Sequence, residues 1–170
     1  MRLTRELKPH VIITAGPEGI CGHCDHIAVH RWTTIAIAMT AGHDCLPRHI
    51  SQTCKPHRVS TLYLRVLPEI LLEERRTSGA AAPVMTDGVP FRFVGWPCED
   101  ITSIIDVAEY ADQKLQGIRC HATQVGRESR WAEAPDEVVQ DLGFAHEHCE
   151  LARATVRWPQ DKQTDLFDQL

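Results

Sequence analysis

The sequence predicts an α/β fold with a parallel-type strand near its start and antiparallel strands towards its C-terminus. A short apolar run at Val11–Ala15 lacks polar alternation, as is typical of a strand buried on both faces of a parallel sheet. A helix-period apolar pattern follows it, after a loop that contains glycine. Near the end of the chain, Ala152–Trp158 alternates apolar with polar residues, which indicates a strand with one wet face.

The chain has the size and composition of one globular domain. It holds 170 residues, of which 43% are hydrophobic and 24% charged, so it can bury a core without disulfide bonds. We therefore expect residues 1–170 to form a single domain. The net charge of −5 and the lack of any Lys/Arg block argue against nucleic acid as a partner.

The N-terminus and the cysteines predict a cytoplasmic location. Met1–Lys8 alternates charged with apolar residues and lacks the apolar stretch of a signal peptide. No segment approaches the roughly 20 apolar residues that a membrane-spanning helix needs. The cysteines are 7, an odd number, and are scattered along the sequence rather than spaced like a secreted disulfide framework. We expect reduced thiols and no membrane span.

The first half of the chain is expected to continue as helix, strand, helix and loop. Asp25–Thr40 is predicted as a buried helix, with Gly42 where a C-cap belongs. Val59–Val66 is predicted as a strand, Pro68–Arg76 as a short helix that proline opens, and Thr77–Pro90 as a mobile loop. The apolar stripe of the first helix is formed by Ala28, Trp32, Ile35, Ala36 and Met39, and Val29 and Ile37 add a second apolar face.

The second half is expected to contain three further strands and two helices. Phe91–Val94 and Ile101–Val107 have the composition of strands, and Val107–Gln124 has the apolar spacing of a helix. A last helix is predicted over Pro135–His148, before the alternating strand at Ala152–Trp158. The apolar face of that strand is expected to be Ala152, Ala154, Val156 and Trp158.

Reactive side chains concentrate between the first strand and the first long helix. In an open α/β sheet the ligand site lies at the carboxyl ends of the strands, so this position favours a catalytic role. His23 and His26 flank Asp25, and a carboxylate beside an imidazole fixes its tautomer and raises its basicity. In a simpler interpretation, Asp25 caps the helix and both histidines are surface residues.

The same segment contains a C-x-x-C tetrapeptide, Cys21–Cys24, between a strand and a helix. It resembles the active site of protein disulfide isomerase-like thioredoxin folds. The residue before it is Ile20, where such domains usually carry tryptophan. A thiol–disulfide oxidoreductase that uses Cys21 and Cys24 therefore stays open as an alternative function, and so does a binding module without catalysis.

Four stretches, in this order, resemble the C-terminal half of the PIG-L/LmbE-like N-deacetylases. In the first, a strand leads to Gly22-His23-Cys24-Asp25-His26, where the family has G-H-P-D-H. The resemblance implies a Rossmann-like sheet and a zinc-dependent amide hydrolase. Its substrates would be N-acetylglucosamine-type glycoconjugates or related acetylated small molecules. The four stretches are Lys8–Val29, Pro56–Tyr63, Lys114–Gln124 and Thr164–Phe167.

The resemblance also implies roles for individual residues. His26 would bind Zn²⁺, His23 would assist the transition state as acid or oxyanion stabiliser, and Asp25 would position His23. These roles are chemically coherent, because zinc activates its bound water and polarises the amide carbonyl while an imidazole meets the developing oxyanion. Cys24 stands where the family has proline, and a thiol there can compete as a soft metal ligand.

One part of the family's site has no counterpart in the sequence. The other two zinc ligands and the general base of the family come from an A-H-P-D-D-E motif, which the chain lacks. A catalytic zinc typically keeps three protein ligands. We therefore expect a truncated family member that is inactive alone or depends on a partner chain. The Val11–Ala15 strand would then be an apolar sheet edge, open to self-association or to that partner.

Overall fold

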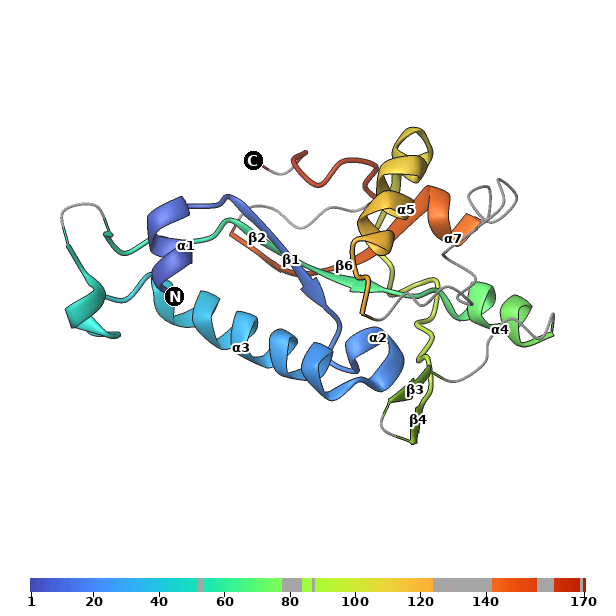
Figure 1. Ribbon diagram of the computed structural model, residues 1–170. Helices are drawn as coiled ribbons and strands as arrows, with labels where there is room; N and C mark the ends of the chain where they lie inside the picture. Colours follow the sequence, from blue (N-terminus) through green and yellow to red (C-terminus); the bar gives the residue numbers. More distant parts are fainter. Residues whose placement is uncertain (52–53, 78–83, 87, 124–141, 156–160, 169) are drawn as a thin grey trace. The chain divides into compact units, whose positions relative to one another are not determined.

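The computed structural model of the chain (Figure 1) describes residues 1–51, 54–77, 84–86, 88–123, 142–155, 161–168 and 170. The chain divides into two compact units, one formed by Met1–Ser103 with His148–Leu170 and the other by Ile104–Glu147. Within the described residues, no helix has the length and the apolar character needed to cross a membrane.

The larger unit is built on a mixed sheet. Strand β1 (Val11–Ala15) pairs in parallel with β2 (Thr61–Val66), and β2 pairs antiparallel with β6 (His146–Ala154). With β5 (Ser103–Asp106), the strand order is β1-β2-β6-β5. The predicted α/β class is confirmed, as are the parallel-type first strand and the antiparallel pairing towards the C-terminus.

The helix after β1 begins and ends close to the predicted positions. A short helix, α2 (Gly19–Gly22), leads into α3 (Cys24–Thr40). The C-cap of α3 is Ala41, one residue before the glycine predicted there. Local spacing of apolar residues was sufficient to find this helix, because the pattern repeats over more than four turns.

The face that α3 buries contains Ile37 of the second predicted apolar face but leaves part of the predicted stripe exposed. Ile37 and Thr40 are buried, whereas the side chains of Trp32 and Ile35 are 75% and 57% exposed. The sheet-facing side also carries His30, whose Nδ1 lies 2.8 Å from the carbonyl oxygen of Ala15 at the end of β1. Periodicity identifies an apolar stripe, but it does not say which side of the helix meets the sheet.

A helix that the sequence analysis did not predict, α1 (Arg2–Leu7), closes the far end of α3 (Figure 1). Its Arg5 is fully buried. The Nε of Arg5 donates to the carbonyl oxygen of Thr40 at 3.2 Å, and Nη2 donates to those of Gly42 and Cys45, both at 2.8 Å. A helix leaves its last carbonyls unpaired at the negative end of its dipole, so this buried cation stabilises the C-terminus of α3.

The region after β2 contains more regular structure than predicted. Helix α4 (Glu69–Thr77) matches the prediction within a residue. The described residues of the expected mobile loop include a hairpin of β3 (Val84–Thr86) and β4 (Val89–Phe91), with Gly88 at φ +78° in the turn. An Asp-Gly pair between strand-forming residues signals such a hairpin. The strand predicted over Phe91–Val94 is wrong, since only its first residue lies in β4.

The last strand differs from the prediction in its start and in its buried face. The described part of the expected helix over Pro135–His148 is α7 (Leu142–Ala145), and β6 already begins at His146. Cys149 and Leu151 are buried, whereas Ala152, predicted to face the core, is exposed. A register shift opposite Leu62 and Tyr63 changes the alternation at this point, and a bulge is not visible in a pattern of residue types. Residues 124–141 and 156–160 lie outside the described residues.

The core beside β6 is completed by the C-terminal tail. Tyr63 is fully buried and packs with Cys149 and Leu151. Its hydroxyl donates to Oε1 of Gln163 at 2.9 Å, and Oγ of Ser103 donates to the same oxygen at 3.2 Å. Burial raises the pKa of Tyr63 above its usual value, although the hydrogen bond to Gln163 lowers it.

The smaller unit has its own core. After β5, a 3₁₀ turn (Ala108–Tyr110) leads into α5 (Ala111–Arg119), which confirms a helix in this part of the chain. Nζ of Lys114 lies 2.7 Å from Oε1 of Glu147 and 4.8 Å from the ring centre of Phe144. The packed side chains are Ala111, Leu115, Ile118 and Phe144.

Candidate active site

The three predicted site residues lie together where β1 ends and α3 begins (Figure 1). His23 is the N-cap residue of α3, and Asp25 and His26 belong to its first turn. The ring centres of His23 and His26 are 5.3 Å apart. The structure thus gathers these side chains at the carboxyl end of a parallel strand, the usual place of a ligand site in an α/β sheet.

The loop that leads to this turn is sharply bent. Gly19 and Gly22 have φ values of +68° and +76°, a region that glycine adopts readily. Ile20 lies between them with φ 65° and ψ −61°, where a β-branched residue is strained. A Cβ on Gly19 would come within 3.0 Å of Cβ of His26, so the loop packs tightly against α3.

His26 is held by one ring nitrogen and leaves the other free to bind a metal. Its Nδ1 lies 3.1 Å from the carbonyl oxygen of Gly19. Since a carbonyl only accepts hydrogen bonds, this contact assigns the hydrogen to Nδ1 and a lone pair to Nε2. Metal-binding histidines are commonly oriented in this way, through a backbone carbonyl on the second nitrogen. The Sγ of Cys21 lies 3.6 Å from the same Nδ1.

His23 has the opposite arrangement. Its Nδ1 accepts a hydrogen bond from the backbone N–H of Asp25 at 3.1 Å. The neutral ring therefore carries its hydrogen on Nε2, where it acts as a donor rather than as a metal ligand. The contact uses the backbone N–H of Asp25 and not its carboxylate, and His23, rather than Asp25, is the N-cap residue of α3. The two histidines present different groups, a lone pair on His26 and an N–H on His23.

A group of three neighbouring side chains has the composition of a metal site. The ligand atoms of His23, Cys24 and Asp25 all lie within 4.8 Å of one another. The Sγ of Cys24 donates to Oδ1 of Asp25 at 3.7 Å. Because the tautomer of His23 places a hydrogen on Nε2, the sulfur of Cys24 and the carboxylate oxygen of Asp25 are the better metal ligands in this group.

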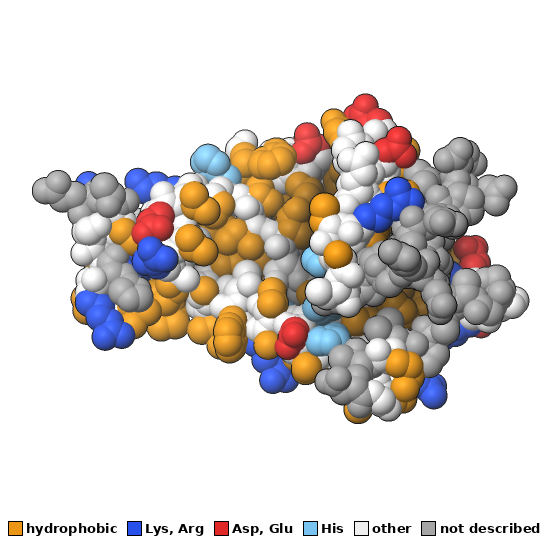
Figure 2. Space-filling view, viewed as in Figure 1, with side chains coloured by type: hydrophobic (Ala, Val, Ile, Leu, Met, Phe, Trp, Pro, Cys, Tyr) orange, Lys and Arg blue, Asp and Glu red, His pale blue; other side chains and the backbone are white. Residues whose placement is uncertain are grey.

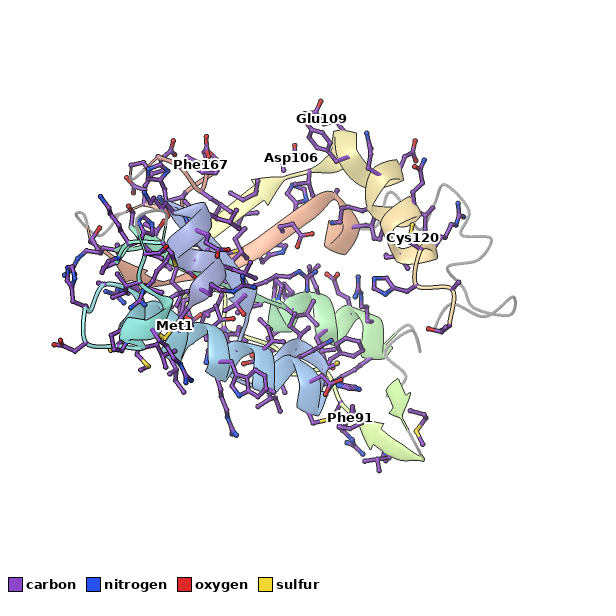
Figure 3. The ribbon with its side chains drawn as sticks, turned by 60° about the vertical axis from the view of Figure 1, so that its left-hand side comes forward. Met1, Phe91, Asp106, Glu109, Cys120 and Phe167 are labelled. Carbon is purple, nitrogen blue, oxygen red and sulfur yellow. The ribbon has the colours of Figure 1, made fainter. Side chains whose placement is uncertain are left out.

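The hairpin supplies an aromatic wall that the sequence analysis missed. The ring centre of Phe91, at the end of β4, lies 5.2 Å from that of His23 (Phe91 is labelled in Figure 3). The backbone N–H of Val94 donates to the carbonyl oxygen of Ile20 at 2.9 Å, which ties the hairpin strand to the bent loop. The Asp-Gly turn was the sequence signal for this hairpin, but no local signal placed it beside His23.

Several titratable side chains lie next to this site. Burial raises the pKa of Glu150 on β6, the nearby carboxylates of Asp100 and Glu18 raise it further, and His30 lowers it. Within the described residues, the buried Oε1 of Glu18 has no hydrogen-bond partner. Glu150 thus interacts with Glu18, the residue that precedes α2 after the end of β1.

The two thiols of the C-x-x-C tetrapeptide have different environments. Cys21 is buried beside His26, whereas Cys24 is exposed on the first turn of α3. Neither is in a disulfide, and the other five cysteines are also free. The exposed thiol is the one available to a metal or an oxidant.

Comparison with known proteins identifies relatives of this chain. No family model matches it. It is 33% identical over 171 residues to a 1D-myo-inositol 2-acetamido-2-deoxy-alpha-D-glucopyranoside deacetylase of Rhodococcus jostii. The aligned region covers 96% of this chain and 56% of the relative. Deacetylases of the same name in Streptomyces avermitilis and Thermobifida fusca are 30% and 31% identical over 98% and 97% of the chain. The chain spans about half the length of the curated relatives it matches.

Proposed function

We propose that this chain, a relative of the PIG-L/LmbE-type N-deacetylases, is the part of a zinc-dependent amide hydrolase that carries one metal ligand and the transition-state donor. The names of its relatives describe deacetylation of an acetamido sugar linked to inositol, and we propose an acetylated amino sugar as substrate here. The observation that carries the proposal is the opposite anchoring of His26 and His23. We also propose that the sheet is the Rossmann-like sheet of that family.

The donor atoms on α3 are suitable for zinc. Cys24 and Asp25 offer sulfur and oxygen, and these atoms belong to one group of possible ligands. His26 lies outside that group and offers Nε2 from the same turn. All three are ligand types that zinc binds in proteins. Bound zinc supplies an activated water and polarises a carbonyl group. Catalytic zinc typically keeps three protein ligands. We propose that the missing ligands and the general base come from a segment equivalent to the part of the relatives that this chain does not span.

The chain's own contribution to catalysis is a donor held in place. We propose that His23 donates a hydrogen bond from Nε2–H to the amide oxygen as negative charge develops there, while the proton for the leaving nitrogen comes from the general base, which has taken it from the attacking water. The orientation of His23 is maintained by the backbone N–H of Asp25 and by the ring of Phe91. A preorganised donor of this kind contributes about 10²–10³ in rate.

Zinc binding by the purified chain tests this assignment. We expect His26→Ala to weaken zinc binding more than about 100-fold, beyond the 10–100-fold that loss of a supporting partner costs. His43→Ala, which removes an exposed histidine outside the segment, is the matched control and should leave the affinity unchanged. Equal affinities of the two variants in calorimetric titration would remove His26 from the metal site.

A second variant separates the two histidine roles. His23→Gln replaces the fixed imidazole donor with a flexible amide, so zinc should still bind while acetyl release in the assembled enzyme falls. Acetate release from N-acetylglucosamine conjugates measures that activity. If His23→Gln and His26→Ala lose zinc to the same extent, the division of roles is wrong.

We also propose a cytoplasmic location for this chain. All seven cysteines are free, which supports a reducing compartment. Cys24 is exposed and would be oxidised readily outside such a compartment. Thiol titration of protein purified rapidly from cells under alkylating conditions should therefore find seven reduced thiols.

A further inference from the structure

We propose that Cys21 and Cys24 form a modification site, at which hydrogen peroxide joins the two sulfur atoms in a reversible disulfide and thereby weakens zinc binding at His26. The weakening of zinc binding rests on the proposed function, which assigns His26 as a metal ligand, whereas formation of the disulfide does not. The two cysteines are called the thiol pair below. The proposed hydrolase gives Cys21 no role, and C-x-x-C is the spacing of redox-active pairs.

The thiol pair has one accessible and one sheltered member. Cys24 is exposed at the first residue of α3, whereas Cys21 is only 8% exposed. Histidine side chains reach the surface near the junction of α2 and α3 (Figure 2), so small solutes have access to this turn. Redox-sensitive pairs combine an accessible thiol, which meets the oxidant, with a second thiol that resolves the oxidised product. Cys24 has the first of these positions and Cys21 the second.

The backbone between the two cysteines is short and adaptable. Three peptide units separate the Cα atoms of Cys21 and Cys24, so these atoms lie at most about 11 Å apart, and a disulfide needs about 4.4–6.8 Å. Gly22 lies between them at φ +76°, and glycine adopts both signs of φ readily. A Cβ placed on Gly22 would lie 3.6 Å from its nearest neighbour, the carbonyl oxygen of Arg92, which is an ordinary contact. Rotation about Gly22 can therefore bring the two sulfur atoms together without unfolding α3.

The sheltered thiol contacts the side chain that the proposed function assigns to zinc. Sγ of Cys21 lies 3.6 Å from Nδ1 of His26, and the carbonyl oxygen of Gly19 lies 3.1 Å from the same nitrogen. Gly19 and Cys21 belong to the same short helix, α2, and a Cβ on Gly19 would come within 3.0 Å of Cβ of His26. Because this packing is tight, drawing Cys21 towards Cys24 changes both contacts that fix the ring. Loss of such a supporting partner costs about 10–100-fold in metal affinity.

One molecule of hydrogen peroxide balances the oxidation. The sulfur of Cys24 attacks the O–O bond, an S–O bond forms as the O–O bond breaks, and the thiol hydrogen leaves with the released oxygen as water. The sulfur of Cys21 then attacks the sulfur of Cys24, an S–S bond forms as the S–O bond breaks, and the hydrogen of Cys21 leaves in a second water. The thiol pair loses two electrons, which the peroxide gains. A dithiol such as dithiothreitol reverses the reaction by thiol–disulfide exchange.

Zinc and the disulfide oppose each other in this scheme. If the disulfide lowers the affinity for zinc, bound zinc must favour the reduced thiol pair by the same factor, because the coupling between two equilibria is reciprocal. The sulfur of Cys24 is also one of the possible metal ligands, and the metal-binding form of cysteine is the thiolate rather than the disulfide. Bound zinc should therefore protect the thiol pair from peroxide.

Treatment of the purified chain with a stoichiometric amount of hydrogen peroxide tests the proposal. We expect the number of free thiols to fall by two from seven, and peptide mapping by mass spectrometry to find Cys21 linked to Cys24. Calorimetric titration should then show a zinc affinity about 10–100-fold lower than that of the reduced chain, restored by dithiothreitol. Saturating zinc, added before the peroxide, should slow formation of the linked peptide.

Two single substitutions assign the disulfide to the thiol pair. Cys21→Ser should abolish the linked peptide. Cys120→Ser removes an exposed cysteine at the C-cap of α5, where no other cysteine lies within three positions, and is the matched control. It should leave both the linked peptide and the loss of zinc affinity unchanged. Circular dichroism of both variants checks that they fold.

The outcomes separate this proposal from the proposed function. Oxidation that leaves Cys24 unlinked, or links it to a cysteine other than Cys21, overturns the proposal. A linked thiol pair with unchanged zinc affinity overturns it as well. If the reduced chain binds no zinc, the proposed function fails by itself, and the NMR signals of the His26 ring decide. A shift of these signals on disulfide formation supports the proposal, and unchanged signals overturn it.

Discussion

The two sides of the sheet in the larger unit differ in how completely they are packed. On the side of β6, Tyr63, Cys149 and Leu151 form a closed core, and Gln163 of the tail satisfies the buried hydroxyl of Tyr63. On the side of β1, this strand stands at the edge of the sheet, and the side chains of Val29, Trp32 and Ile35 on α3 are exposed. The site histidines lie on the open side. Within the described residues, the packed core thus lies on the β6 side of the sheet, whereas the candidate site lies on the β1 side, where apolar side chains are exposed.

The largest expected effect comes from removing one large side chain on each side. Leu151→Ala empties a fully buried position and should lower the free energy of unfolding by about 2–5 kcal/mol. Trp32→Ala removes a larger but mostly exposed side chain, and its effect should stay within about 0.5 kcal/mol. Urea unfolding of both variants measures the difference. Equal losses would mean that α3 is already covered in the isolated chain.

A smaller effect of opposite sign is expected in the bent loop on the open side. Ile20→Gly relieves the strain of a positive φ and should raise the free energy of unfolding by about 1 kcal/mol. Ile70→Gly, in the first turn of α4, is the matched control and should lower it by up to about 1 kcal/mol, because glycine is a poor helix former. If Ile20→Gly is also destabilising, the loop does not store strain.

The smallest effect concerns the charge at the boundary between the two sides. The pKa of Glu150 is raised above its usual 4.5, mainly by burial. The contribution of the protonated Glu150 carboxyl to the free energy of unfolding is therefore fully present below pH 4.5 and is lost as the pH rises through the folded-state pKa. Glu150→Gln should raise stability at pH 7 by roughly 0.3 kcal/mol, since water screens the partly exposed group. Thermal unfolding should show the gain at pH 7 and none at pH 4; a gain at both pH values would exclude ionisation as its cause.

Sequence patterns predicted the elements whose signals are local. The bounds of α3, β2 and α4 follow from periodicity and from a proline at a helix start. The buried face of β6 was wrong because a register shift opposite Tyr63 depends on the partner strand. Trp32 and Ile35 were assigned to the buried stripe of α3 because a pattern records that a surface is apolar, not that a neighbour covers it.

The candidate site residues and their roles stay a prediction, and the contacts that orient these residues could not be predicted from the sequence. Position after a buried strand and the G-H-x-D-H segment selected His23, Asp25 and His26, which the structure brings together. The opposite hydrogen positions on the two rings depend on the carbonyl of Gly19 and the backbone N–H of Asp25. Such contacts follow from three-dimensional geometry, which residue types alone do not encode. Phe91 was missed for the same reason, since it lies 68 positions after His23 in the sequence.

The bond between Tyr63 and Gln163 has a consequence for the order of events during synthesis. Its two residues are separated by 100 positions, so the acceptor leaves the ribosome long after the strand that needs it. Until then the Tyr63 hydroxyl must stay hydrated, which delays closure of the core around Leu151. During translation the core on the β6 side of the sheet therefore stays incomplete until the segment around Gln163 has been synthesised.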